Sequence, residues 1–229
     1  MGTSTSFRAP PVPRWQAFIT ALERGLPLER VRSELFNAGR DWESAIASPA
    51  VAVFATAVVD AVEVLPDQLA GADRPERVLQ AYVAAARAAS AEVEGTAALP
   101  LAERALTAVL IRSAAGKESL STQSAEAAAE QLRTALSERE AVVASYLGEV
   151  LGQYARHAAS REIGRLTEGP KPVSVAAARE MTRALAQAAV EVGHTVRTAT
   201  ADAASLRDAW ASLVHDAFRR GRQLPRETG

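Results

Sequence analysis

The sequence predicts an all-α protein, and three observations support this fold class. Alanine, the residue that most favours helices, supplies 51 of the 229 residues. Apolar residues recur at helical spacing along most of the chain, and no segment has the alternating pattern of a strand. The segment 137–166 is apolar around most of its circumference, as is typical of a helix buried by its neighbours. We therefore expect a multi-helix bundle of about seven or eight helices around this central helix.

The central segment carries two apolar stripes when its residues are placed at helical spacing. Ser137 and Glu140 have the spacing of a capping box, in which each side chain satisfies a free backbone N–H group. A stripe of small residues should let one neighbouring helix approach closely: Ala141, Ser145, Gly148, Gly152, Ala155 and Ala159. A stripe of large residues should fill the core: Val143, Tyr146, Leu147, Val150, Leu151 and Tyr154. The narrow polar remainder comprises Glu149, Gln153, Arg156 and Ser160.

Three regions follow from the distribution of proline and apolar residues. Residues 1–13 should form an extended, flexible arm, because Pro10, Pro11 and Pro13 restrict the backbone. Residues 14–222 should form a single α-helical domain, and residues 223–229 a loose tail. The first helix of the domain is expected from residue 14, with its apolar spacing ending at Gly25.

The helices between the first and the central one are bounded by residues that start or end helices. Pro is favoured in the first helical turn, and Gly just after the last. In order, the expected helices are 28–36 followed by Gly39, 49–65 ended by Pro66, a helix capped by Asp73 and ended near Gly95, a helix from Pro100 to Gly116, and 125–136.

The last helical region follows a firm break at residues 169–172, which contain two prolines. Ser174 is the expected N-cap. The stretch 195–202 is rich in Thr and Ala and could bend or split the helix. A strong apolar face then follows: Leu206, Trp210, Leu213, Val214 and Phe218.

Composition limits the classes of function. The net charge is −1, so no global field attracts nucleic acid or an anionic membrane. The chain has no cysteine, which excludes disulfides and thiolate metal sites. We expect no membrane span and no signal peptide, and hence a cytoplasmic protein. We also expect no cofactor. Lys117 and Lys171 are the only lysines among 26 basic residues, a bias typical of GC-rich bacteria.

Two groups of residues on the last helices resemble parts of known sites. Glu191 and His194 have the Glu-x-x-His spacing of di-iron bundles, but the second copy that such a site needs is missing, so we favour a solvated pair. Ser212, His215 and Asp216 share a helix face, but no nucleophile turn or oxyanion element accompanies them. We therefore expect neither a metal site nor a catalytic triad.

A row of basic residues ends the central segment. His157, Arg161 and Arg165 are spaced four apart, and they could contact an anion or a phosphate group. The alternative, which we favour, is that cations are stabilised at a helix C-terminus by the macrodipole and pair with acidic neighbours.

The N-terminal lead offers a different kind of site. Gly2 is small enough for Met1 to be removed, which would leave an unhindered α-amine on a hydroxyl-rich segment. The lead also fits the myristoylation pattern, but that modification is eukaryotic and the composition is bacterial, so we set it aside. Such a terminus can reach into the active site or groove of another protein.

The lead Met1-Gly2-Thr3-Ser4-Thr5-Ser6-Phe7, the Pro-containing stretch ending in Trp15, and the Ala-rich helical body together resemble the B component of the Qat anti-phage defence systems. Those operons also encode an ATPase, a QueC-like enzyme and a TatD-like nuclease. The resemblance implies that the QueC-like partner attaches a 7-deazaguanine-type base to Gly2. It further implies that Thr3, Ser4, Thr5, Ser6 and Phe7 form the recognition lead.

Three hypotheses for the function follow. The first is a non-enzymatic component of a bacterial defence system that presents Gly2 for modification and docks other components on its helical body. The second is a helical regulator or scaffold with a passive arm. The third is an enzyme whose site is dispersed over the helices, which would need a deep pocket with converging charged groups.

Overall fold

A computed structural model of the chain describes residues 12–93, 95–116, 119–120, 123–168, 172–196 and 203–224. Within these ranges the regular structure is helical and contains no strand, which confirms the all-α fold class. The α-helices are α1 (Val12–Glu23), α2 (Leu28–Ala38), α3 (Arg40–Ile46), α4 (Pro49–Ala70), α5 (Pro75–Ala91), α6 (Leu99–Ala115), α7 (Ala125–Leu136), α8 (Arg139–Ser160), α9 (Ile163–Glu168), α10 (Val175–His194) and α11 (Ala203–Arg222).

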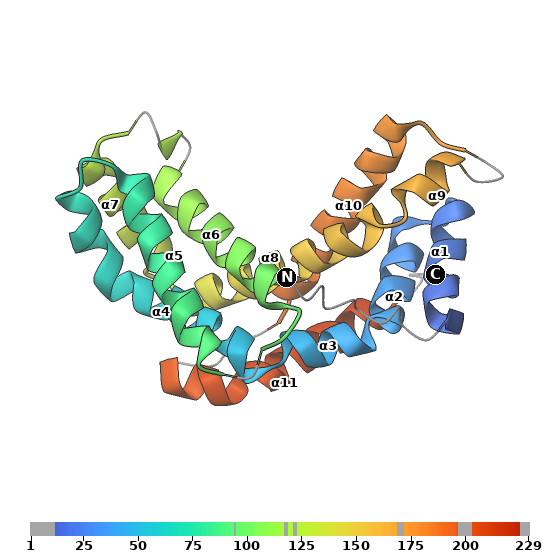
Figure 1. Ribbon diagram of the computed structural model, residues 1–229, viewed down its shortest axis with the longest axis horizontal. Coiled ribbons are helices and arrows are strands. Elements are labelled where there is room, and N and C mark those ends of the chain that lie inside the picture. Colours follow the sequence, from blue (N-terminus) through green and yellow to red (C-terminus); the bar gives the residue numbers. More distant parts are fainter. Residues whose placement is uncertain are drawn as a thin grey trace, which may run out of the picture.

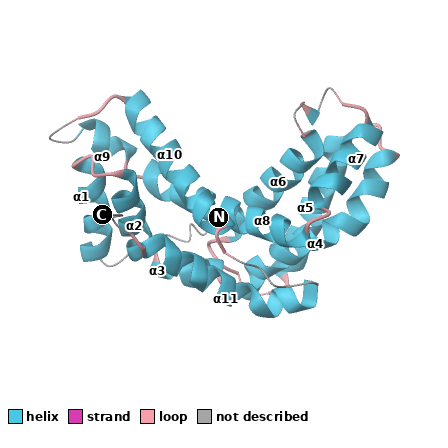
Figure 2. Ribbon diagram, turned by 180° about the vertical axis from the view of Figure 1, so that it is seen from behind, coloured by secondary structure: helices cyan, strands magenta, loops and turns pink. Residues whose placement is uncertain are grey.

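The helices form two groups that diverge in a V-shaped outline (Figure 1). One group contains α4, α5, α6 and α7, and the other contains α1, α2, α9 and α10. Helices α3, α8 and α11 lie where the two groups meet, and the view from behind shows the same arrangement (Figure 2). Helix α8 packs against α10 on one side and against α6 and α4 on the other, so it joins the two groups.

Helix α8 is buried along most of its length, and Tyr146 and Tyr154 are fully buried. The helix begins at Arg139, and the capping box predicted at Ser137 and Glu140 is wrong. Ser137 has helical backbone angles and donates its hydroxyl to the Thr134 carbonyl at 2.8 Å, so it belongs to the end of α7. The N-cap position of α8 is Glu138, and its side chain makes no capping hydrogen bond.

The small stripe of α8 packs against α10. A Cβ atom added at Gly152 would lie 2.6 Å from a Val190 methyl group, and one added at Gly148 would lie 2.7 Å from the Val190 carbonyl oxygen. On α10, a Cβ at Gly193 would overlap the Gly148 backbone. The stripe therefore allows the close approach that the spacing predicted, although Ala141, at its N-terminal end, is exposed.

Several helix boundaries differ from the sequence-based prediction, and α1 begins at Val12, within the predicted arm, and not at residue 14. Helix α4 does not end at Pro66 but continues to Ala70. Proline cannot donate a backbone hydrogen bond to the helix, but the extra turn buries Leu69 in the core at 0% exposure. The N-cap of α5 is Arg74 and not Asp73. The segment 137–166 is not one continuous helix, because the chain turns after Ser160 and α9 forms a separate short helix.

Helix α3 was not predicted. It directly follows Gly39, whose sequence context favours a helix end, and it buries only two large side chains, Trp42 and Ile46. Asp41 and Glu43 lie in its first turn, where negative charge is favoured by the helix dipole.

Helix α4 is long and apolar enough to cross a membrane by length and composition, so the expectation that no segment meets this test is corrected. In the fold, 67% of its most apolar window is buried against other helices. The apolar surface of α4 is thus used in packing, as in the core helix of a globular protein.

An aromatic cluster fills the junction of α2, α3, α8 and α11. The Phe36 ring lies 5.0 Å from that of Phe218, and the Trp42 ring lies 5.5 Å from that of Tyr154. The Tyr154 hydroxyl donates to the Leu35 carbonyl at 3.1 Å, which satisfies this buried polar group. This cluster positions the polar residues described next.

Candidate functional site

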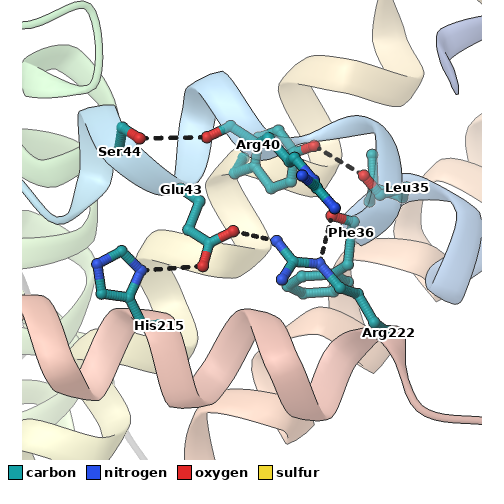
Figure 3. A network of polar contacts seen from close by, with 8 residues as sticks. Leu35, Phe36, Arg40, Glu43, Ser44, His215 and Arg222 are labelled. Carbon is teal, nitrogen blue, oxygen red and sulfur yellow. Dashed lines mark hydrogen bonds and ion pairs between the residues drawn. The ribbon is translucent and has the colours of Figure 1, made fainter.

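A polar cluster beside Phe36 connects α3 to α11 (Figure 3). Its centre is the Glu43 carboxylate, whose side chain is 13% exposed. One oxygen lies 2.9 Å from His215 Nδ1, and the other accepts a hydrogen bond from the Arg222 guanidinium. We call Glu43, His215 and Arg222 the α3–α11 clamp.

Arg222 makes further contacts that fix the end of α11. Its Nε donates to the Phe36 carbonyl at 3.3 Å, and its guanidinium lies 5.7 Å from the centre of the Phe218 ring. Its own carbonyl accepts a hydrogen bond of 2.7 Å from the Ser33 hydroxyl. The clamp thus joins three helices, and its groups are already engaged with one another and with the backbone.

The residues considered for a triad are not brought together. His215 faces Glu43, whereas Asp216 pairs with Arg219 and with Arg220, the latter at 2.8 Å. Burial raises the pKa of Asp216, but the hydrogen bonds and charges of Arg220 and Arg219 outweigh this effect and hold the pKa below its usual value. Ser212 is exposed. Ser212, His215 and Asp216 are therefore not hydrogen-bonded to one another as the nucleophile, base and acid of a triad would be.

A second polar cluster joins α6 to α8. Glu149 is 5% exposed, and its two carboxylate oxygens accept hydrogen bonds of 3.0 Å from Arg112 and from Gln153. A buried carboxylate needs such partners, because an isolated charge is costly in an apolar environment. The narrow polar strip of α8 therefore lies in part against α6.

The row of basic residues predicted at the end of the central helix is divided between α8, the turn after it and α9. Arg165 lies on α9, and its guanidinium is 3.7 Å from Glu162, which also accepts a hydrogen bond of 3.0 Å from the Trp15 indole. His157 packs edge-on against Trp42 at 5.4 Å. Burial lowers the pKa of His157, and the positive charges of Arg161 and of Arg104 on α6 lower it further. His157 and Arg161 therefore share their surroundings with Arg104, and Arg165 has an acidic partner of its own.

The Glu191 and His194 side chains are both exposed on α10. The His194 ring packs over Gly148, where an added Cβ would lie 3.0 Å from Cδ2. Within the described ranges, no group of three or more His, Cys, Asp or Glu residues is arranged to hold a metal ion.

An open hollow lies on the surface between α5 and α6. Its volume is about 390 Å³, and it adjoins a second hollow of about 450 Å³ at the N-terminal end of α6. Leu79 and Val83 lie in the first hollow, and Arg87 and Glu103 line both. Sequence reasoning missed this surface, although Leu79 and Val83 have the spacing of one helix face.

The N-terminal candidates Gly2, Thr3, Ser4, Thr5, Ser6 and Phe7 lie outside the described residues. The described clusters are those of Glu43, Glu149 and Glu162, and each connects a carboxylate to a group on another helix. In comparisons with known proteins, no family model, no curated protein and no solved structure matches the chain.

Proposed function

We propose that this protein is a non-enzymatic component of a bacterial anti-phage defence system, which presents Gly2, after removal of Met1, to a QueC-like enzyme for modification. The observation that carries the proposal is the N-terminal lead, Met-Gly-Thr-Ser-Thr-Ser-Phe, joined by a short Pro-containing stretch to an Ala-rich helical body. The helical body, centred on α8, acts in the cytoplasm as a docking scaffold for the ATPase and the TatD-like nuclease of the same operon.

The use of polar groups in the body supports a scaffold. Glu43 holds α11 against α3, Glu149 holds α6 against α8, and Glu162 contacts Trp15 of α1. Carboxylates that are engaged in this way fix the relative positions of helices, and a general acid or base would instead face a substrate. The body thus has the features of a frame on which other proteins assemble.

The start of α1 supports presentation of the lead. The helix begins at Val12, and its next residues, Pro13 and Arg14, are exposed. The described body therefore begins with exposed residues at the end that follows the lead. A partner enzyme could engage Gly2 without unfolding the helical domain.

The test is a phage-challenge assay in bacteria that carry the chain with its neighbouring genes. We expect Gly2→Glu to abolish protection, because the large acidic side chain would block the approach of a modifying enzyme to the α-amine. The matched control is Gly164→Glu, since Gly164 is an exposed glycine with open space around it, and this variant should protect normally.

Both variants should have the melting temperature of the native chain, because Gly164 is exposed and the lead is expected to lie outside the helical domain. Full protection by Gly2→Glu would contradict presentation of Gly2 and would leave a helical scaffold with a passive arm. Loss of folding in Gly2→Glu would make the segment structural and would also contradict the proposal.

A further inference from the structure

The hollow between α5 and α6 is a groove with apolar residues along its middle and charged residues at its ends. Leu79 and Val83 of α5 line it and are 3% and 6% exposed. Ile111 of α6 also lines it and is 44% exposed, which is high for a large apolar side chain. The Thr107 hydroxyl donates to the Glu103 carbonyl at 2.9 Å, so the methyl group is the part of this side chain left for a bound group.

The two ends of the groove carry opposite charges. Glu76, in the first turn of α5, lies at one end, and Arg104 of α6 lines the adjoining hollow at the other. Between the two hollows, Arg87 Nη1 lies 3.5 Å from Glu103 Oε1. No described residue forms an ion pair with Glu76 or with Arg104, so both charges remain available.

The length of the groove suits a short helix. Its lining residues on α5 run from Glu76 to Arg87, which at 1.5 Å per residue is about 16 Å, or about three helical turns. A helix of that length can place apolar residues at positions i, i+3, i+4 and i+7 along such a surface. A membrane surface fits less well, because Glu76 and Glu103 at the rim would be repelled by anionic lipids.

We propose that the α5–α6 groove is a docking site for an amphipathic helix of a partner protein, with a basic residue next to Glu76 and an acidic residue next to Arg104. This inference rests on the docking role within the proposed function, but it does not depend on the modification of Gly2. The apolar face of the partner packs on the exposed Ile111 and Ala84, above the buried Leu79 and Val83, and the two end charges fix the direction in which the helix lies.

The probe for the test is a fluorescent helical peptide of about three to four turns with an apolar stripe, acidic residues in its first turn and basic residues in its last. This charge distribution also stabilises an isolated helix. Binding to the full-length chain is measured by fluorescence anisotropy. We expect saturable binding that Ile111→Glu weakens by about tenfold or more, because the substitution puts a charge against an apolar surface.

Val64→Glu is the matched control for the apolar contact, since Val64 on α4 is 42% exposed and lies outside the groove. For the end charge, Glu76→Lys should weaken binding about threefold or more at low salt and less at high salt. Its control is Glu29→Lys, in the first turn of α2. Neither control variant should change the affinity. If Ile111→Glu fails to fold, Ala84→Glu, at an exposed position in the same groove, replaces it.

Several outcomes would overturn the proposal. One is the absence of peptide binding to the native chain at about 1 mM, and another is equal weakening by Val64→Glu and Ile111→Glu. Binding of an apolar dye that depends on Ile111, without binding of the peptide, would make the groove a small-molecule site. A dimer in light scattering that Ile111→Glu dissociates would make the occupant a second copy of the chain.

The experiment is repeated on the Gly2→Glu chain. Peptide binding that survives in this variant separates the groove from the N-terminal site. If protection fails in cells while peptide binding remains, the defect lies in the presentation of Gly2. If Ile111→Glu loses both peptide binding and protection while Gly2 is still modified, the result supports the docking role independently of the modification of Gly2.

Discussion

Gly193 and Gly148 bring the α8 and α10 backbones together at a point where no side chain fits. An added Cβ at Gly193 would overlap the backbone of Gly148, which cannot rotate away as a side chain could. The spacing of small residues on α8 predicted a close neighbour, but not which helix it would be. That information depends on contacts between residues far apart in the sequence.

Gly193→Ala should therefore destabilise the protein by about 1–3 kcal/mol or more, because the two helices must separate to accept a methyl group. Gly164→Ala is the control, since nothing lies within 4 Å of the added Cβ, and it should be neutral or stabilising by up to about 1 kcal/mol. Urea denaturation of both variants gives the free energies of unfolding. Equal stabilities would contradict the packing of α8 against α10.

His157 makes stability depend on pH. Its pKa in the folded protein lies below the usual 6.5, because burial, and then the charges of Arg161 and Arg104, disfavour the protonated ring. The unfolded chain thus binds a proton more readily, so stability starts to fall as the pH drops below about 6.5 and falls until the pH reaches the lowered pKa of the folded protein.

His157→Gln should reduce the loss of stability between about pH 7.5 and pH 5.5, because the substituted side chain does not titrate. His194→Gln is the control, since His194 is exposed on α10. Thermal melts across this range would detect the change. A pH dependence identical to that of the native chain would show that His157 does not carry it.

At the scale of elements, the α3–α11 clamp depends on a helix that the sequence did not reveal. Helix α3 was not predictable, because it follows Gly39 directly and contains few apolar residues. The half-buried position of Glu43 on this helix was therefore not predictable either. Similarly, the sequence placed Glu149 in the polar strip of α8 but could not show that Arg112 of α6 covers it. The end of α6 at Gly116 was predictable because a glycine acts locally, whereas Pro66 does not end α4, because packing of the following turn outweighs the local preference.

Glu43→Gln should lower the free energy of unfolding by about 1–3 kcal/mol, because the half-buried Arg222 would lose its charged acceptor. Glu63→Gln is the control, since Glu63 forms an exposed ion pair with Arg139, and it should cost less than about 1 kcal/mol. Hydrogen exchange should become faster in the last turns of α11 in Glu43→Gln alone. Unchanged exchange there would contradict the role of the clamp.

At the scale of the whole molecule, two groups of helices diverge from a junction formed by α3, α8 and α11 (Figure 1). The composition predicted a helical body packed on small residues, and the structure has this character in the contact between α8 and α10. The arrangement of the two groups was not predictable, because it depends on how distant helices meet. The α5–α6 groove was hidden for the same reason, since its walls come from two helices.

The lead 1–7 and the helical body have separate parts in the proposed function: the lead is modified, and the body docks. The most direct test of this claim is a mass spectrum of the N-terminal peptide from protein expressed with its native gene neighbours. We predict that Met1 is absent and that Gly2 carries added mass, which disappears when the QueC-like gene is deleted. An intact Met1, or an unmodified Gly2 in the presence of that gene, would contradict the account.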